Sequence, residues 1–337
     1  MRWQYVNNTK LISTGNTYLA FTAALSLILN GFIYPWIPSD IHLVSLMVAT
    51  FTQQFSACLF TFMVLACIII NLRVLRKAST VGPLLREFFL HRLLALVAVF
   101  LCMFNFSVFK QTIPAISPFS WDPVLLHIDM TLLGGQSLTT WLNTYLPAIS
   151  LSHYADYCYA GWAAISGTIL LWRVLCNQPY QRFHFLLSWL LCWILLGSIA
   201  ALLFSSVGPC FYAYFYTDIP STITQTYPLQ LSGTLLTDTA KTFLLNNSKN
   251  HHYAIGMGIS AFPSLHVATS VINAQTLSAQ HAVLGWLGWL YVVAVSISAT
   301  YLGFHYLIDC LVAIAAAYGI WLFTTYLLRD HENLNDH

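Results

Sequence analysis

The chain has 337 residues, of which 58% are hydrophobic, 15% aromatic and only 7% charged. This composition is far from that of an average soluble domain and predicts a membrane protein with several spans. The 13 Lys and Arg residues nearly balance the 11 Asp and Glu residues, so there is no electrostatic basis for binding nucleic acid. We therefore expect an all-α, polytopic membrane helical bundle whose substrate comes from the membrane or its surface.

Membrane-spanning helices need about 20 mostly apolar residues to cross the hydrocarbon core of a bilayer. Roughly eight stretches meet this rule, and the first two form an added N-terminal part, residues 1–80, ahead of a core at 81–337. Two long connections, 111–153 and 208–262, interrupt the core. The expected spans lie near 17–35, 43–70, 88–110, 155–175, 183–207, 263–281, 283–302 and 304–328.

The Lys and Arg residues indicate the orientation, because short loops rich in these residues stay in the cytoplasm. They gather before the first span, in the short connections and after the last span, which puts them all on one side if both termini are cytoplasmic. The two long connections, with His266 and His305, then face outside. We expect an integral protein of a membrane such as the bacterial inner membrane, with its active site facing the periplasm or the exterior.

Two segments near the C-terminus place ionisable residues at the edges of apolar runs: Ile259-Ser-Ala-Phe-Pro-Ser-Leu-His266 and Tyr301-Leu-Gly-Phe-His-Tyr-Leu-Ile-Asp309. In a helix that begins at His305, Asp309 lies one turn further on and shares the same face. Its carboxylate can hold the imidazole in one tautomer and steady the imidazolium, which leaves the other nitrogen free to attack phosphorus. This spacing predicts His305 as the nucleophile.

His266 follows a Pro-Ser pair at the expected start of a helix. The free N–H groups and the dipole of a first helical turn favour an anion at this position. His266 therefore suits a general acid that protonates the leaving oxygen. The alternative is that both histidines only anchor helix ends at the headgroup interface. The combination of the two patterns argues against it, because ionisable groups at membrane depth are costly and usually functional.

These residues resemble the second and third motifs of the type 2 phosphatidic acid phosphatase superfamily, which read roughly Pro-Ser-Gly-His and Ser-Arg-x5-His-x3-Asp. Pro263, Ser264 and His266 match the second motif, and Ser298, His305 and Asp309 match the third. The resemblance implies a six-helix core in which His305 becomes phosphorylated, His266 acts as the acid and Asp309 orients His305. It also implies that Ser264 and Ser298 contribute to substrate binding. No metal and no organic cofactor is implied.

The sequence departs from the family pattern at several positions. Leu265 replaces the usual Gly of the second motif, and Ala299 stands where the third motif normally carries a phosphate-binding Arg. The first motif, Lys-x6-Arg-Pro, is missing from its usual place; Lys110 with Ser117-Pro118 has its spacing but lacks the Arg and lies too far upstream. The remaining candidates for meeting the phosphate charge, unless they belong to a solvated loop, are Lys241, Lys249, His251 and His252.

The Phe-Pro-Ser-Leu-His form of the second motif looks more like the branch that contains inositol phosphorylceramide synthases. In that branch a lipid hydroxyl attacks the phosphohistidine, so the resemblance implies a phosphotransferase with a lipid phosphate or phosphodiester donor and a lipid or alcohol acceptor. Two alternatives stay open: a lipid phosphate phosphatase that uses the same residues, and a catalytically degenerate protein that binds or moves a lipid phosphate. The oligomeric state is unknown from sequence.

The segment from Ser117 to Gln136 is too polar and rich in Gly to span a membrane, but it carries an apolar stripe through Leu125, Leu126, Ile128 and Leu132. We expect an interfacial helix on the outer surface. Similar Trp-Asp and Gly-Gly elements accompany the synthase branch, so the resemblance implies a lid or headgroup platform. A packed loop that anchors the neighbouring spans is the alternative.

Overall fold

The computed structural model describes residues 2–33, 35, 81–227, 235–250 and 258–332, and within these ranges it contains helices and no strand. The all-α class expected from the sequence is therefore confirmed. The elements are α1 (Arg2–Ile33), α4 (Val81–Ile116), α5 (Asp122–Leu132), α6 (Leu138–Tyr145), α7 (Ala148–Ala160), α8 (Trp162–Leu175), α9 (Pro179–Leu191), the π-helix η3 (Cys192–Ala200), α10 (Ala201–Leu203), the 3₁₀-helix η4 (Pro209–Phe211), α11 (Tyr212–Phe215), α12 (Ser221–Thr226), α13 (Leu236–Asn250), α14 (Leu265–Ser278), α15 (Ala282–Tyr301) and α16 (Leu307–Glu332).

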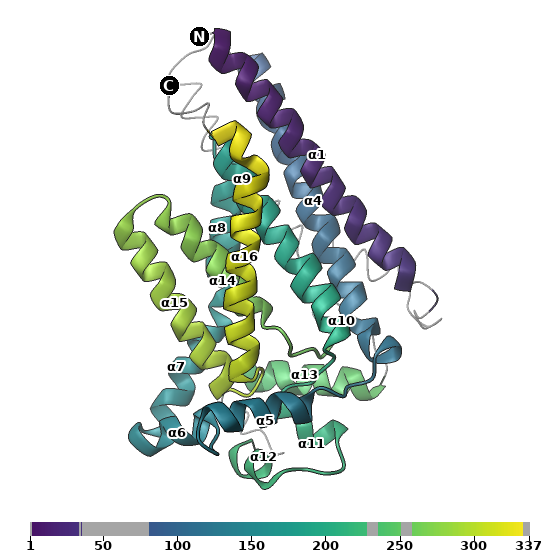
Figure 1. Ribbon diagram of the computed structural model, residues 1–337, viewed down its shortest axis with the longest axis vertical. Coiled ribbons are helices and arrows are strands. Elements are labelled where there is room, and N and C mark those ends of the chain that lie inside the picture. Colours follow the sequence, from purple (N-terminus) through teal and green to yellow (C-terminus); the bar gives the residue numbers. More distant parts are fainter. Residues whose placement is uncertain (1, 34, 36–80, 228–234, 251–257, 333–337) are drawn as a thin grey trace.

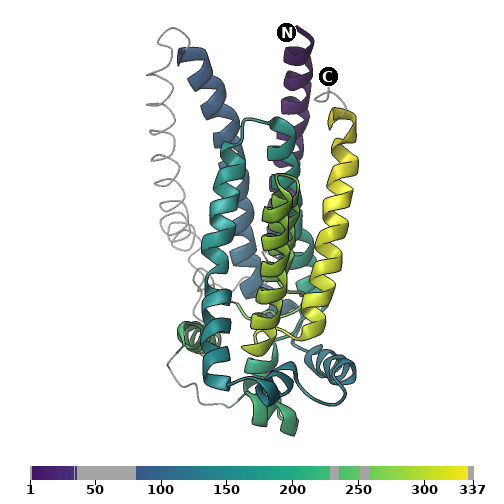
Figure 2. The ribbon, with the colours of Figure 1, turned by 90° about the vertical axis from the view of Figure 1, so that its left-hand side faces the viewer.

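The long helices run along the long axis of the molecule, and the short ones gather at one end (Figure 1; Figure 2). Helices α5, α6, α11, α12 and α13 form this end, and the start of α1 and the end of α16 lie at the other. Helices α4 and α15 finish at the end with the short helices, whereas α14 and α16 begin there. The helix ends that carry the two sequence motifs therefore meet the short helices.

Five helical stretches in the described residues are long and apolar enough to cross a membrane: Arg92–Ile116, Leu151–Leu175, Pro179–Leu203, Ala282–Tyr301 and Leu307–Arg329. They correspond to the spans expected at 88–110, 155–175, 183–207, 283–302 and 304–328. The span expected at 43–70 lies outside the described residues. The span expected at 17–35 coincides with the last part of α1, which begins much earlier, at Arg2.

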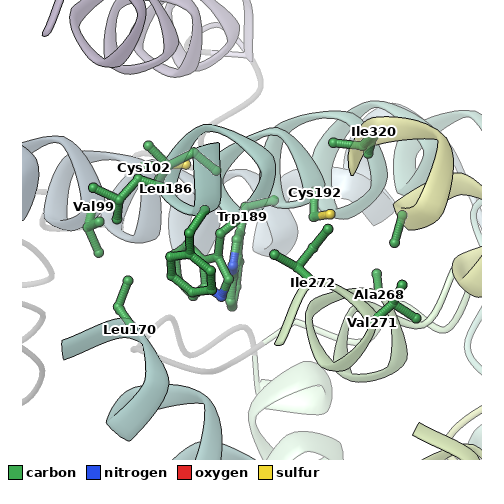
Figure 3. Close-up of a cluster of buried hydrophobic side chains, with 14 of the residues drawn as sticks. Val99, Cys102, Leu170, Leu186, Trp189, Cys192, Ala268, Val271, Ile272 and Ile320 are labelled. Atoms are coloured by element: carbon green, nitrogen blue, oxygen red, sulfur yellow. The ribbon is translucent and has the colours of Figure 1, made fainter. Parts of the chain in front are cut away.

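The span expected at 263–281 is shorter in the structure. Helix α14 has 14 residues, which is about 21 Å at 1.5 Å per residue and less than the thickness of a bilayer core. Val267, Ala268, Val271 and Ile272 are fully buried, because α8, α9, α15 and α16 pack around α14. Figure 3 shows this core, where α14 side chains meet Trp189 and Cys192. The apolar run expected to be a span is thus a short helix at the centre of the bundle.

Two of the expected spans are not regular helices. Gly161 separates α7 from α8 within 155–175; a Cβ at this residue would lie 2.9 Å from the carbonyl oxygen of Tyr157. The span at 183–207 contains the nine-residue π-helix η3 between α9 and α10. π-helical insertions often occur beside functional sites, and η3 contributes Trp193 and Gly197 to the cavity described below.

Four of the basic residues used to predict orientation lie in the described part of the chain, towards the end of the bundle opposite the motifs. Arg92 is near the start of α4, Arg173 near the end of α8, Arg182 near the start of α9 and Arg329 near the end of α16. Arg173 is buried, and its guanidinium donates to Gln181 Oε1 at 2.7 Å and to the carbonyl of Thr276 at 3.1 Å. The separation between the positive end and the motif end is therefore built into the fold.

Candidate functional site

His305 lies in the short connection between α15 and α16, and its side chain is only 5% exposed. Its Nδ1 atom is 2.7 Å from the carbonyl oxygen of Ala261. A carbonyl oxygen can only accept, so Nδ1 must carry the proton of this hydrogen bond. The lone pair of the neutral ring is then on Nε2, and the residue lines a cavity. The backbone of the second motif thus fixes the tautomer that a nucleophile requires.

Asp309 lies one helical turn after His305, as the spacing predicted. Its Oδ2 atom is 3.6 Å from His305 Nδ1 and accepts a hydrogen bond of 2.9 Å from the backbone N–H of Tyr306. The carboxylate is therefore at ion-pair distance from the imidazole, and Ala261 supplies the shorter contact. This carbonyl carries no sequence signature, so the sequence alone could not identify it.

His266 is the second residue of α14 and packs among aromatic rings. The ring of Tyr159 stacks on it at a centroid distance of 4.4 Å, and Tyr159 Oη lies 3.2 Å from His266 Nδ1. Trp162 covers another side at 4.3 Å. The centroids of His266 and His305 are 6.0 Å apart. The two histidines therefore face a common space, His266 from the start of α14 and His305 from the connection between α15 and α16.

The carboxylate of Asp122 holds the segment 206–208, which precedes both motifs in sequence and lies between them in space. Asp122, which is fully buried, accepts hydrogen bonds from the backbone N–H groups of Val207 and Gly208 and from the hydroxyls of Tyr216 and Tyr306, all between 2.8 and 3.1 Å. Burial raises the pKa of Asp122, and these donors lower it. Asp122 therefore ties the residue after His305 to a loop almost 100 residues upstream.

The same loop holds the second motif. The carbonyl of Ser206 accepts from the N–H of Ala261 at 3.0 Å, and its hydroxyl accepts from the N–H of Phe262 at 3.1 Å. Gly208 has φ +87°, and a Cβ there would lie 2.5 Å from the carbonyl oxygen of Phe304. Only glycine fits this contact. The carbonyl that orients His305 is thus held by a loop that neither motif includes.

Helix α5 was expected as an interfacial helix, and the structure confirms a helix there. The expected stripe is divided, because Leu125 is buried while Leu132 is exposed. Buried Asp129 accepts hydrogen bonds from the backbone N–H groups of Leu307 and Ile308 at 2.6 and 2.9 Å. These two N–H groups lie in the first turn of α16, where backbone N–H groups have no acceptor inside their own helix. In the structure α5 thus anchors the helix that follows His305.

Asp129 gives a pH-dependent prediction. Burial raises the pKa of its carboxyl from 3.8 to about 6, against the effect of the two N–H donors. The folded protein therefore favours the protonated form, so the stability contribution of this group is complete below pH 3.8 and is lost as the pH rises through about 6. We expect Asp129→Asn to flatten the decrease in melting temperature of the detergent-solubilised protein between pH 4 and about 6.5. Asp218→Asn, which changes an exposed carboxyl, should show the same decrease in melting temperature with pH as wild type. If wild type and Asp129→Asn had the same dependence of melting temperature on pH, the prediction would be wrong.

A cavity of about 400 Å³ lies in front of the two histidines. This volume is in the range of small-molecule sites. Most of the lining is apolar and comes from α4, α7, α8, η3, α13 and α14; the residues include Phe106, Trp162, Trp193, Leu244 and Leu265. Pro263, Leu265 and His266 also place the start of α14 at the cavity wall. Sequence reasoning set Lys110 aside as too far upstream, but it is part of this lining.

The two serines expected to bind substrate do not line the cavity. Ser264 is fully buried, and its hydroxyl has no hydrogen-bond partner among the described residues. Ser298 is buried and donates to the carbonyl of Ala294 in its own helix at 2.8 Å. Asp156, near the start of the expected fourth span, caps α13 by accepting hydrogen bonds from the backbone N–H groups of Leu236 and Thr237 at 2.8 Å.

The cations proposed for the outer loop lie on or after α13, a helix that the sequence did not predict. Lys241 is buried and pairs with Asp238 at 3.9 Å, with its Nζ atom 5.2 Å from the ring centroid of Phe304. It does not line the cavity. The backbone of Lys249 belongs to the last turn of α13, while His251 and His252 fall outside the described residues.

The fold and the site define a membrane-embedded helical bundle with a histidine pair and a carboxylate at an apolar cavity. A family model described as the PAP2 superfamily matches residues 123–323. The chain therefore belongs to the PAP2 superfamily, whose members act as phosphatases and phosphotransferases on lipid phosphates. No curated protein and no solved structure matches the chain. Residues 81–122, which include α4 with Lys110, lie upstream of the matched segment.

Proposed function

We propose that the protein is a lipid phosphotransferase that moves a phosphate-containing headgroup through a phosphohistidine intermediate on His305. The observation that supports this most strongly is the tautomer of His305. Its Nδ1–H is bound by the carbonyl of Ala261, and its Nε2 lone pair is left for the cavity that His266 shares. A histidine held only for packing has no need of this arrangement.

In the first half of the reaction, Nε2 of His305 attacks the phosphorus of the donor lipid and forms the N–P bond. The P–O bond to the lipid alcohol breaks, and the leaving oxygen takes a proton from the imidazolium of His266. The ring of His305 becomes positively charged, which the carboxylate of Asp309 at 3.6 Å stabilises. The separation of 6.0 Å between the two ring centroids leaves room for a phosphoryl group between them.

In the second half, neutral His266 takes the proton of an acceptor hydroxyl, and the acceptor oxygen attacks the phosphorus. The N–P bond breaks, and its electron pair returns to Nε2 of His305. Water in place of the acceptor gives hydrolysis with the same residues. The apolar wall formed by Phe106, Trp162 and Trp193 favours the hydrocarbon part of a lipid acceptor over bulk water. This lining and the resemblance of the second motif support the transferase over the phosphatase.

We further propose that the site faces the periplasm or the exterior. Arg92, Arg173, Arg182 and Arg329 lie at the opposite end of the bundle from the histidines. Positively charged ends of membrane helices remain in the cytoplasm. Labelling of single-cysteine variants at each end of the bundle with an impermeant reagent in intact cells tests this orientation.

The function is tested with the purified protein and a panel of phosphate-labelled lipid monoesters and diesters, each with and without lipid alcohol acceptors. New phospholipid that depends on the acceptor supports the transferase. Release of free phosphate or of a phosphorylated headgroup, unaffected by acceptors, would make the protein a hydrolase. Lipid binding without any turnover would overturn both and leave a binding protein.

A further inference from the structure

Lys110 stands at the cavity although it is far from both motifs in sequence. It is in the last turns of α4, and the loop that leads into the second motif packs on its backbone: a Cβ at Gly258 would lie 3.0 Å from the carbonyl carbon and oxygen of Lys110. The Nζ atom is 6.0 Å from the ring centroid of Phe106, which also lines the cavity. Lys110 therefore shares one wall with the motif loop.

The charge of Lys110 has no carboxylate partner among the described residues. The ion pairs there join Lys241 to Asp238 and His305 to Asp309. Within the described part of the cavity wall, Lys110 is also the only Lys or Arg. A lysine held in an apolar cavity without a counter-ion costs free energy, and an anionic ligand would offset that cost.

The net charge of the groups around the cavity indicates which charge of the bound phosphate group fits the site. When His266 is protonated to act as an acid, it and Lys110 carry two positive charges, and Asp309 carries one negative charge beside His305. The site then holds one net positive charge. A phosphodiester has one negative charge and neutralises it, whereas a phosphomonoester has a charge of about −1.5 to −2 at pH 7 and leaves an excess charge in an apolar cavity, which is costly.

Two further carboxyl groups act in the same direction. Asp122 and Asp129 are buried and are not part of the lining of the cavity. When ionised, they add negative charge near the site and increase the repulsion of a dianion more than that of a monoanion. The repulsion from these two carboxylates thus adds to the charge balance of the site in favouring the less charged phosphate.

We propose that Lys110 is the phosphate-binding cation of this protein and that it selects a phosphodiester lipid, a monoanion, as the donor. This inference rests on the proposed function of His305. Lys110 of α4 would then take the role of the phosphate-binding Arg that Ala299 replaces. Lys110 lies outside the segment that matches the family.

The test compares Lys110→Met with wild type, using a phosphate-labelled diester, phosphatidylglycerol or phosphatidylinositol, and the monoester phosphatidic acid in detergent micelles. We expect wild type to use at least one of the diesters with a kcat/KM about tenfold or more above that for phosphatidic acid. Lys110→Met should lower kcat/KM for that diester by about 100-fold. Most of the loss should be in KM, because the phosphate is charged in both the ground state and the transition state.

Three further variants separate a binding role from a structural one. Lys110→Arg keeps the charge and should restore most of the affinity. Lys241→Met removes the lysine that is paired with Asp238 and should leave KM unchanged. Ser260→Lys, which adds a second cation to the cavity wall, should shift the preference towards phosphatidic acid. A Lys110→Met protein with the KM of wild type, or a wild type that prefers phosphatidic acid, would overturn the inference.

A binding measurement distinguishes failure of this inference from failure of the proposed function. A dialkyl phosphate is a monoanion that can be titrated into the His305→Ala protein, where no turnover occurs. Weaker binding after Lys110→Met supports the role of Lys110 even if His305 proves not to be the nucleophile. Equal binding with and without Lys110 would overturn it even if the phosphohistidine is found.

Discussion

His305→Ala is expected to abolish turnover, with a loss of more than about 10⁴-fold in kcat. No other described side chain at the cavity combines a free imidazole nitrogen with an N–H fixed by a carbonyl, as His305 does through Ala261. A substitution that removes Nε2 therefore removes the covalent route itself. His127→Ala changes an exposed histidine on α5 at the same end of the molecule and should retain full activity.

The intermediate provides a direct measurement. A donor labelled in its phosphate should transfer label to the wild-type protein and not to His305→Ala. The label should be lost in acid and retained in alkali, as a phosphoramidate requires. Label that persists in His305→Ala and disappears in His266→Ala would show that the two histidines have the opposite roles.

His266→Ala is expected to lower kcat by about 10² to 10⁴-fold for donors with an ordinary alcohol leaving group, because the alkoxide would leave without a proton. The loss should be small for a nitrophenyl phosphodiester, whose leaving group needs no acid. The measurement is the slope of log kcat against the pKa of the leaving group, which should become steeper in the variant. An equal loss for all leaving groups would contradict the acid role.

Tyr159→Phe is the matched control for this experiment. It keeps the ring that stacks on His266 at 4.4 Å and removes only the hydroxyl 3.2 Å from Nδ1. The proton donor remains, so we expect a smaller loss than in His266→Ala. A Tyr159→Phe protein as impaired as His266→Ala would move the acid function to the tyrosine.

The residues that could be predicted from sequence are those whose relation is local. Asp309 follows His305 by one helical turn, and His266 follows a Pro-Ser pair at a helix start, so periodicity and helix-end chemistry were enough to place them. The five apolar spans found in the structure were also predicted, because length and composition decide them. Helix α14 is shorter than the expected span, since composition alone does not give the length of a helix that is buried in a protein core.

The residues that were missed act across large sequence separations. The carbonyl of Ala261, the hydroxyl of Tyr159 and the carboxylates of α5 reach the site only after the helices pack. Lys110 was set aside because distance along the chain was taken as distance in space. Ser264 and Ser298 match the family motifs, yet one is fully buried and the other is bonded within its own helix, so a matching residue need not reach the cavity.

The hydrogen bonds of Asp122 also set the order in which the site can form. Its partners are 85, 86, 94 and 184 residues further along the chain, so this carboxylate is synthesised long before Tyr306. Contacts of such high sequence separation form late, because closing the loops between them costs entropy. The histidine pair is therefore assembled only after α16 has joined the bundle. A nascent chain that stops before α16 contains both histidines and the cavity helices but lacks Asp309, so its site is incomplete.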